Sequence, residues 1–359
     1  MKKIIRKLLL LANILIIIGM LATGYAGIFN PVIFPMFSTM GYFFPMFAIA
    51  NVVMIMVWVC VRRRMLIVPF TGFLLVYSPM MTYCPVHMAK DIPDGCLKVM
   101  TYNTWMFGIS LENTSTMTQE ERSRKIIQYI ADSNCDIVCI QEALFNNSIN
   151  NYLDSIAKPV TPYIDTCYGQ GGTCVMLLSK HPIKRHELIE YKSVGNLSAA
   201  FFLDINGKEV IVINNHLETN HFSTEEKEQF HTMVKGGMEK QDIKNESGFI
   251  LHKLGDAAVL RAPQAEAVAQ YIRMHKGVPM IVCGDFNDIP LSYTHRTIAQ
   301  DLTDCHTATA NSPGFSYRKN GMYVRIDNIM CSEEFTPFEC HVDKNIDISD
   351  HFPVISLIK

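Results

Sequence analysis

The sequence predicts a layered α/β domain with a mixed β-sheet, preceded by transmembrane helices. Two long uncharged runs near the N-terminus have the length of membrane spans. Further along, short apolar runs alternate with helical stretches, and two of the runs form a hairpin around Asn206-Gly207. Because strands occur both as a hairpin and as strand–helix–strand units, we expect a mixed sheet rather than a purely parallel one.

Charge divides the 359 residues into two parts. Residues 1–89 contain seven Lys and Arg and no Asp or Glu, which leaves 25 basic and 34 acidic residues in 90–359, a formal charge of −9. We therefore expect residues 1–89 to be a membrane anchor. Residues 96–359 have the composition of one soluble α/β domain, because no internal repeat, low-complexity segment or second linker interrupts them.

The anchor contains two or three transmembrane helices. Residues 8–29 and 39–61 are uncharged runs of 22 and 23 residues, and at about 1.5 Å per residue each can cross a hydrocarbon core of about 30 Å. Residues 65–81 are shorter and contain Pro69 and Pro79. They are a third span or a re-entrant or surface-lying segment, and we expect a span because about 17 residues is the lower limit for crossing.

Basic residues predict the orientation in the cytoplasmic membrane. The KKIIRK start and the cluster Arg62–Arg64 are expected to stay in the cytoplasm. Three spans then put the domain on the extracytoplasmic side, whereas two would leave it inside. Alternatively, residues 1–26 are a cleaved signal peptide, although the apolar run that follows still indicates a membrane protein. The cysteines show no spacing typical of a disulfide framework and do not decide the compartment.

The expected elements of the domain follow in order. Helices are predicted at 120–133 and 257–274 from their apolar spacing. Residues 222–246 are polar and helical or partly disordered, and a solvated helix is favoured there over an insertion that faces substrate. Cys139 and Cys283 lie in apolar runs and are expected in the core. Strands are predicted at 97–102, 136–140, 173–179, 199–205, 209–214, 278–283, 324–331 (interrupted by Asp327) and 355–358.

Polar residues stand at five of the predicted strand ends, and the central one is the stretch IVCGDFNDIP at 281–290. Residues two apart on a strand face the same side, so Asp285 and Asn287 are expected to point into one site. A single such residue is more often a cap or a turn residue. Five ends with complementary chemistry favour a common site: Asn103, Glu142, His216, Asp285 with Asn287, and Asp350 with His351.

These residue types suit hydrolysis of a phosphate ester. Carboxylates with an amide form an oxygen-rich site for Mg²⁺ or Mn²⁺, and two histidines supply proton transfer near neutral pH. The sequence contains no GxSxG, Walker, GxGxxG or HExxH motif. Water activated beside a divalent cation is therefore the expected nucleophile.

Six motifs in order resemble the endonuclease/exonuclease/phosphatase superfamily, which includes deoxyribonucleases, neutral sphingomyelinases and inositol polyphosphate 5-phosphatases. The resemblance covers the chain from residue 97. It implies a four-layer α/β/β/α sandwich with two mixed sheets packed face to face. The motifs are MTYNTW (100–105), DIVCIQEA (136–143), NNHLET (214–219), CGDFND (283–288), RIDNI (325–329) and SDHFPV (349–354).

The resemblance also implies metal ligands. Glu142 corresponds to the principal ligand, and Asn103 and Asp350 complete or support the metal shell. The implied cofactor is Mg²⁺ or Mn²⁺.

The remaining site residues have implied catalytic roles. Asp285 orients or deprotonates the attacking water, and Asn287 holds a phosphate oxygen as charge develops. Asp327 pairs with His351 and fixes its tautomer. His216 contacts the phosphate and assists departure of the leaving group; repair nucleases of the exonuclease III type usually have tyrosine in that region.

The function expected from the sequence is a membrane-anchored, metal-dependent phosphodiesterase or phosphatase, with a phospholipid or lipid-linked substrate favoured by the membrane tether. The alternative is a tethered, exported nuclease acting on DNA or RNA. It is less favoured because the acidic domain has no obvious basic stripe for a nucleic-acid backbone. A non-catalytic membrane scaffold is a third reading, against which the intact polar motifs speak.

Overall fold

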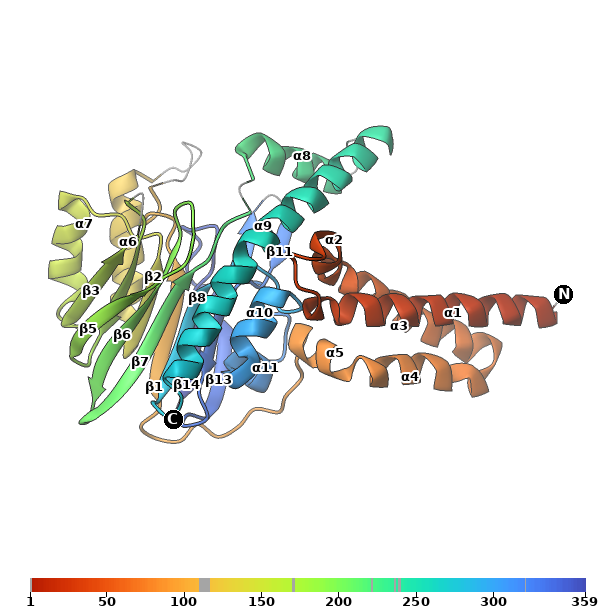
Figure 1. Cartoon of the computed structure of the whole chain (residues 1–359), viewed down its shortest axis with the longest axis horizontal. Helices are drawn as coiled ribbons and strands as arrows, with labels where there is room; N and C mark the ends of the chain where they lie inside the picture. The colour runs from red at the N-terminus through yellow and green to blue at the C-terminus, as the bar shows by residue number, and fades with distance from the viewer. Residues whose placement is uncertain are drawn as a thin grey trace.

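The protein is described by a computed structural model covering residues 2–109, 117–169, 172–220, 222–235, 237, 240–319 and 321–359. An apolar helical head projects from one side of an α/β body (Figure 1). The head helices are α1 (Lys2–Gly24), α2 (Pro35–Ser38), α3 (Phe44–Val61), α4 (Ile67–Leu75) and α5 (Tyr77–Tyr83).

The body contains two six-stranded mixed sheets, each with one parallel pair, β1–β2 and β7–β8. The first sheet has the order β13 (Pro337–Val342), β14 (Val354–Ile358), β1 (Leu97–Asn103), β2 (Ile137–Gln141), β4 (Cys174–Ser179) and β3 (Tyr163–Tyr168). The second has the order β5 (Ile183–Ile189), β6 (Leu197–Ile205), β7 (Lys208–His216), β8 (Met280–Asp285), β12 (Asp327–Cys331) and β9 (Thr303–Asp304). A separate hairpin pairs β10 (Tyr317–Lys319) with β11 (Met322–Val324).

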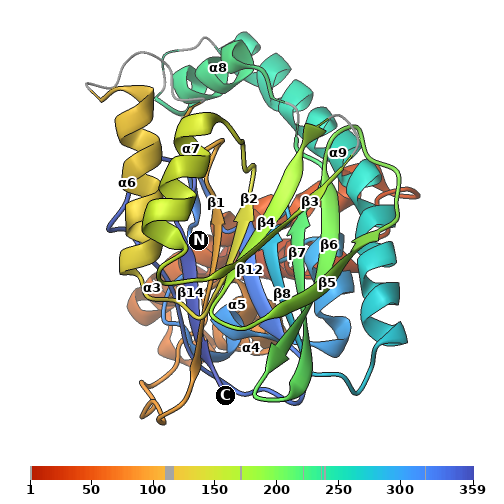
Figure 2. The ribbon, with the colours of Figure 1, turned by 90° about the vertical axis from the view of Figure 1, so that its left-hand side faces the viewer.

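Helices cover the outer faces of both sheets, as Figure 2 shows with α6 and α7 on one side and α9 on the other. The body helices are α6 (Gln119–Asp132), α7 (Asn147–Tyr152), α8 (Thr224–Val234), α9 (Lys240–Met274), α10 (Tyr293–Ile298) and α11 (Cys305–Thr309).

Alternation of side chains along the strands builds the layers. On β1, Val99 packs between the two sheets, whereas Met100 packs with Ile126 of α6 on the outer face. On β6, Phe201 faces the other sheet and Phe202 packs with Val268 of α9. The predicted four-layer α/β/β/α sandwich is therefore confirmed.

Local sequence explains several element ends, and the predicted hairpin is confirmed. Asn206 and Gly207 connect β6 to β7 with φ values of 54° and 81°, which is the positive-φ turn that an Asn-Gly pair favours. Thr118 forms a capping box with Glu121 at the start of α6. Cys139 and Cys283 lie in the core between the sheets, as predicted. All eleven cysteines are described, and all are free thiols.

Two predicted boundaries are wrong. The helix expected at 257–274 is the second half of α9, which begins at Lys240 and has 35 residues. Its first half is mostly polar, and the few apolar residues at helical spacing, at positions 250, 251 and 254, were too sparse to predict a helix there. The strand expected at 324–331 is two strands, because β11 ends at Val324 and β12 begins at Asp327.

The head contains two helices long and apolar enough to cross a membrane, Lys3–Ile28 and Pro35–Val61. A bent pair with an angle of 64°, Arg63–Leu75 and Tyr77–Tyr83, passes the same test together. In Figure 1 this pair runs back beside α1 and α3 to the body. Asparagine side chains join the segments: Asn13 Nδ2 donates to Asn51 Oδ1 at 3.0 Å, and Asn51 Nδ2 donates to the Pro69 carbonyl at 2.9 Å.

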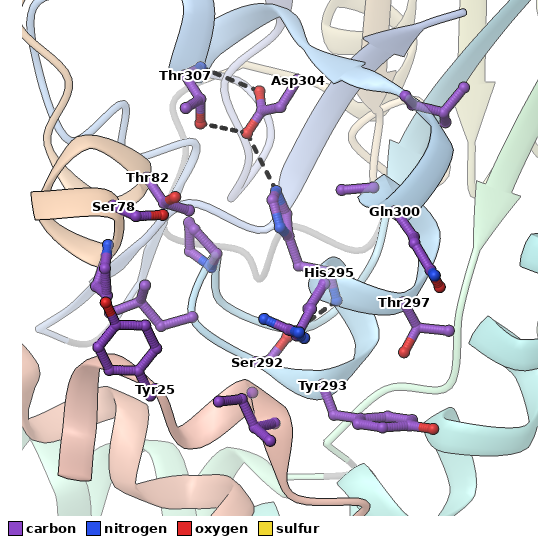
Figure 3. Close-up of a pocket in the computed structure, with 18 of the residues that line it drawn as sticks. Tyr25, Ser78, Thr82, Ser292, Tyr293, His295, Thr297, Gln300, Asp304 and Thr307 are labelled. Carbon is purple, nitrogen blue, oxygen red and sulfur yellow. Dashed lines mark hydrogen bonds and ion pairs between the residues drawn. The ribbon is translucent and has the colours of Figure 1, made fainter. Parts of the chain in front are cut away.

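The head is packed directly on the body. A Cβ on Gly27 would lie 2.7 Å from the Ser292 carbonyl oxygen, so only glycine permits this approach. Arg325 of the body donates to the Thr82 carbonyl at 2.6 Å. A cavity of about 750 Å³ lies at this junction. Figure 3 shows Tyr25, Ser78 and Thr82 of the head among its lining residues, together with the His295–Asp304 pair of the body. The head therefore has a defined position relative to the body.

Candidate active site

Strand topology brings the predicted site residues to one edge of the sandwich. The parallel pairs β1–β2 and β7–β8 end at the same edge, and His216 pairs in register with Asp285. The antiparallel strand β12 begins there, with Asp327 opposite Asp285. The segment that carries His351 leads into β14, the antiparallel neighbour of β1. Strand ends far apart in the sequence therefore meet.

Asn103 holds two carboxylates together. Its Nδ2 donates to Glu142 Oε1 and to Asp285 Oδ2, each at 3.1 Å. His216 Nε2 lies 3.6 Å from Glu142 Oε1 and 3.9 Å from Asp285 Oδ2, and it has no hydrogen-bond partner among the described residues. Burial raises the pKa of Glu142 and lowers that of His216. Converging carboxylate oxygens beside an unpartnered imidazole fit a hard divalent cation.

His351 is held by Asp327. Its Nδ1 lies 2.8 Å from Asp327 Oδ2, and its Nε2 lies 3.8 Å from Asp285 Oδ2. The Tyr317 ring packs edge-on against the imidazole with centroids 5.0 Å apart. Burial alone would lower the pKa of His351, but the carboxylates of Asp327 and Asp285 raise it to about 10. Burial, and then the charge of Asp327, raise the pKa of Asp285 to about 6.

The expectation that Asp285 and Asn287 share one strand face is wrong, because β8 ends at Asp285. Asn287 follows with φ of 52°, and its backbone N–H donates to Asp285 Oδ1 at 2.8 Å. This turn, which asparagine tolerates better than most residues, brings the Asn287 side chain to the same cavity. Gly284 precedes the pair with φ of 133°, and a Cβ there would lie 2.0 Å from the Asn215 carbonyl oxygen. Glycine thus allows the close approach of β7 to β8.

All eight predicted site residues are brought together. Asn103, His216 and Asp327 are linked to the others by the contacts above. Glu142, Asp285, Asn287, Asp350 and His351 line one cavity of about 550 Å³. Another set also has metal-binding geometry: the ligand atoms of Asp285, Asp327 and His351 lie within 4.8 Å of one another. This set was not predicted as a metal site from the sequence, and it shares Asp285 with the cluster around Asn103.

The walls of this cavity were not predicted from the sequence. Residues of α8 and α9 line it, so the interpretation of 222–246 as a solvated helix is wrong for this face. The signal was present as apolar residues at helical spacing, at positions 230 and 233 and at 250, 251 and 254. Trp105 also lines the cavity, with Lys319 Nζ lying 3.9 Å from its ring centroid.

Two family profiles match separate parts of the chain. A sequence profile described as "Endonuclease/Exonuclease/phosphatase family" matches residues 100–351, and one described as a domain of unknown function matches residues 6–83. No curated protein matches the chain.

Solved structures share the fold. TDP2 from Caenorhabditis elegans has 15% identity and a TM-score of 0.50, covering 82% of this chain and 84% of that one. The human Nocturnin catalytic domain with bound sulfate has 14% identity and a TM-score of 0.48, with coverages of 75% and 96%. An endonuclease/exonuclease/phosphatase from Beutenbergia cavernae has 16% identity and a TM-score of 0.49, with coverages of 74% and 71%.

Proposed function

Because the chain belongs to the endonuclease/exonuclease/phosphatase family, we propose that it is a membrane-anchored phosphate-ester hydrolase that depends on Mg²⁺ or Mn²⁺. The observation that carries this proposal is the Asn103 amide, which holds the Glu142 and Asp285 carboxylates beside the buried His216. These groups come from both sheets. Such a concentration of buried and half-buried carboxylates is costly without a cation.

Glu142, supported by Asn103 and Asp350, would hold the cation, since carboxylate and amide oxygens are the ligands that Mg²⁺ and Mn²⁺ prefer. When bound, the ion neutralises phosphate charge and lowers the pKa of water.

The other residues orient the reactants and move protons. Asp285, with a pKa of about 6, is suited to accept a proton from water near neutral pH. His351, kept protonated by Asp327, donates from Nε2 to the phosphate or to the leaving group. Asn287 supplies an amide N–H to a phosphate oxygen. The lowered pKa of His216 keeps it neutral, so it contacts the phosphate as a neutral donor and the leaving-group proton falls to His351.

We expect the purified protein to hydrolyse bis-p-nitrophenyl phosphate with Mg²⁺ or Mn²⁺ and to lose this activity in EDTA. Glu142→Gln should raise the Mn²⁺ concentration for half-maximal rate by about tenfold or more, because it removes a charged ligand. Asp327→Asn should lower the rate and leave that concentration nearly unchanged. The reverse ranking would assign the metal to the Asp285–Asp327–His351 set. Inactivity with every metal would favour the alternative that the protein is a non-catalytic membrane scaffold.

We further propose that α4 and α5 together form a third span and that the body is extracytoplasmic. The bent pair returns along α1 and α3, and the Arg62–Arg64 cluster lies at the turn before it. A C-terminal alkaline phosphatase fusion should therefore be active in intact bacterial cells. An inactive fusion, together with a fluorescent C-terminal green fluorescent protein fusion, would place the body in the cytoplasm.

A further inference from the structure

We propose that the cavity beside the active site binds the hydrocarbon tail of a lipid phosphate ester, so that the substrate is a membrane lipid. This inference rests on the proposed phosphoesterase function and specifies its substrate class. The cavity, of about 550 Å³, falls within the range of about 300–1,000 Å³ typical of small-molecule sites.

The cavity has a polar end and an apolar end. Asp285, Asn287 and His351 line the polar end, where the reacting phosphate would lie. Lys227 of α8 also belongs to the lining and places a cation near the phosphate position. The remaining lining is largely apolar and aromatic: Phe222, Phe230, Met233, Ile250, Leu251 and Leu254. A ligand that fits both ends is amphiphilic, with a phosphate at one end and an apolar chain at the other.

Three separate parts of the chain form the apolar end. The segment that opens the second span contributes Tyr42 and Phe43, and the β10–β11 hairpin contributes Tyr323 and Val324. Helices α8 and α9 contribute the third wall. They are joined by an ion pair between Lys253 and Glu226. The active-site cavity is thus bounded directly by the membrane head.

The neighbouring surface has the character of a membrane interface. Helix α9 packs on α2, where a Cβ on Gly255 would lie 3.4 Å from the Pro35 carbonyl oxygen. Around α2 the chain exposes Ile33 (67%) and Phe37 (50%), and the Phe37 ring contacts Phe29 with centroids 5.5 Å apart. Figure 1 shows α2 between the head helices and the projecting arm of α8 and α9. Exposed apolar and aromatic residues at the end of a span are typical of the bilayer surface.

Nucleic acid fits this surface less well. A single strand is bound by a basic groove that follows its backbone and by aromatic rings that stack its bases. Here the body carries a formal charge of −9 over residues 90–359. The lining beyond the phosphate position is mostly apolar, with aliphatic and Phe side chains of α8 and α9 beside the rings of Tyr42, Trp105 and Tyr323. A hydrocarbon chain can be buried against such a lining without removing polar groups from water, so it is the ligand with the lowest desolvation cost.

A chain-length series tests the proposal. Full-length protein in nanodiscs is given alkyl p-nitrophenyl phosphodiesters from methyl to octyl at monomeric concentrations, and p-nitrophenol release gives kcat/KM. We expect kcat/KM to rise with each methylene, by at most about fourfold per step, because each buried methylene contributes about 0.8 kcal/mol. Hydrolysis of every ester with equal kcat/KM overturns the lipid inference and leaves the proposed function intact. Failure to hydrolyse any ester, bis-p-nitrophenyl phosphate included, overturns the proposed function.

Variants that fill the cavity provide the second measurement. Leu251→Trp and Leu254→Trp place a larger side chain in the lining and should lower the octyl-to-methyl ratio of kcat/KM by about tenfold or more, since they exclude several methylenes. The matched control is Phe249→Trp, on the same helix but 47% exposed, which should keep the wild-type ratio. Partial loss of folded protein changes both rates equally and leaves the ratio unaffected. Unchanged ratios in both filling variants, or cleavage of DNA or RNA in preference to the octyl ester, would overturn the proposal.

Discussion

Asp285→Asn should lower kcat for phosphodiester hydrolysis by about 10²–10⁴-fold, the usual loss when a proton-transferring group is removed. Asparagine has the same shape, but its single amide oxygen can accept only one of the two hydrogen bonds that Asn103 Nδ2 and the Asn287 N–H donate to different oxygens of Asp285. The fold should still survive, because the substitution also removes a buried negative charge. Steady-state hydrolysis of bis-p-nitrophenyl phosphate measures the effect, and Asp301→Asn, at an exposed aspartate, is the control. A variant with wild-type kcat would exclude Asp285 as the group that handles the attacking water.

The same substitution should stabilise the metal-free protein. The pKa of Asp285 rises from 3.8 to about 6, chiefly through burial, so the folded state binds a proton more tightly than the unfolded state does. The contribution of Asp285 to the free energy of unfolding is therefore greatest below pH 3.8, and it is lost as the pH rises to about 6. In EDTA at neutral pH, Asp285→Asn should gain about 1–3 kcal/mol in free energy of unfolding and lose this pH dependence. A lower melting temperature would contradict this account.

The body was largely predictable because its information is local. The apolar runs of β1 and β2 indicate strands that are buried on both faces, and the Asn206-Gly207 turn specifies a hairpin register. Strands without such a pattern were missed. In β5 (Ile183–Ile189) most side chains are exposed or half-buried, and β13 has a register irregularity near Pro337. Their positions depend on neighbouring strands rather than on their own sequence.

The site was predictable where strand ends carry it and unpredictable where tertiary packing forms it. Parallel strand pairing brings Asn103 beside Glu142 and His216 beside Asp285, independently of the conformation of the loops. The left-handed conformation of Glu142 (φ 53°) has no sequence signal, whereas that of Asn287 (φ 52°) has only the general tolerance of asparagine for positive φ. The cavity walls depend on how the head docks. Tyr42 lies more than 240 residues from Asp285 in the sequence and reaches the same cavity only through the packing of the head on the body.

Arg261→Met should destabilise the protein by about 3–5 kcal/mol, because it leaves a buried carboxylate without its counter-charge. Arg261, on α9, is buried and forms an ion pair with Asp288 at 3.3 Å. Its Nη1 also donates to the Glu218 carbonyl at 3.0 Å and to Asn220 Oδ1 at 2.9 Å. These contacts join α9 to the loops after β7 and β8.

Thermal unfolding in nanodiscs measures the loss, and Arg273→Met, at an exposed arginine of the same helix, should change stability by no more than about 0.5 kcal/mol. Adding Asp288→Asn to Arg261→Met should recover part of the loss, since it removes the uncompensated charge. If Arg261→Met and Arg273→Met have the same melting temperature, the Arg261–Asp288 ion pair does not stabilise the packing of α9. Because Asp288 directly follows Asn287, the Arg261 variant should also lower kcat/KM while the protein is still folded. A direct phosphate contact would instead weaken substrate binding without destabilising the fold, so the two measurements together separate a structural arginine from a substrate-binding one.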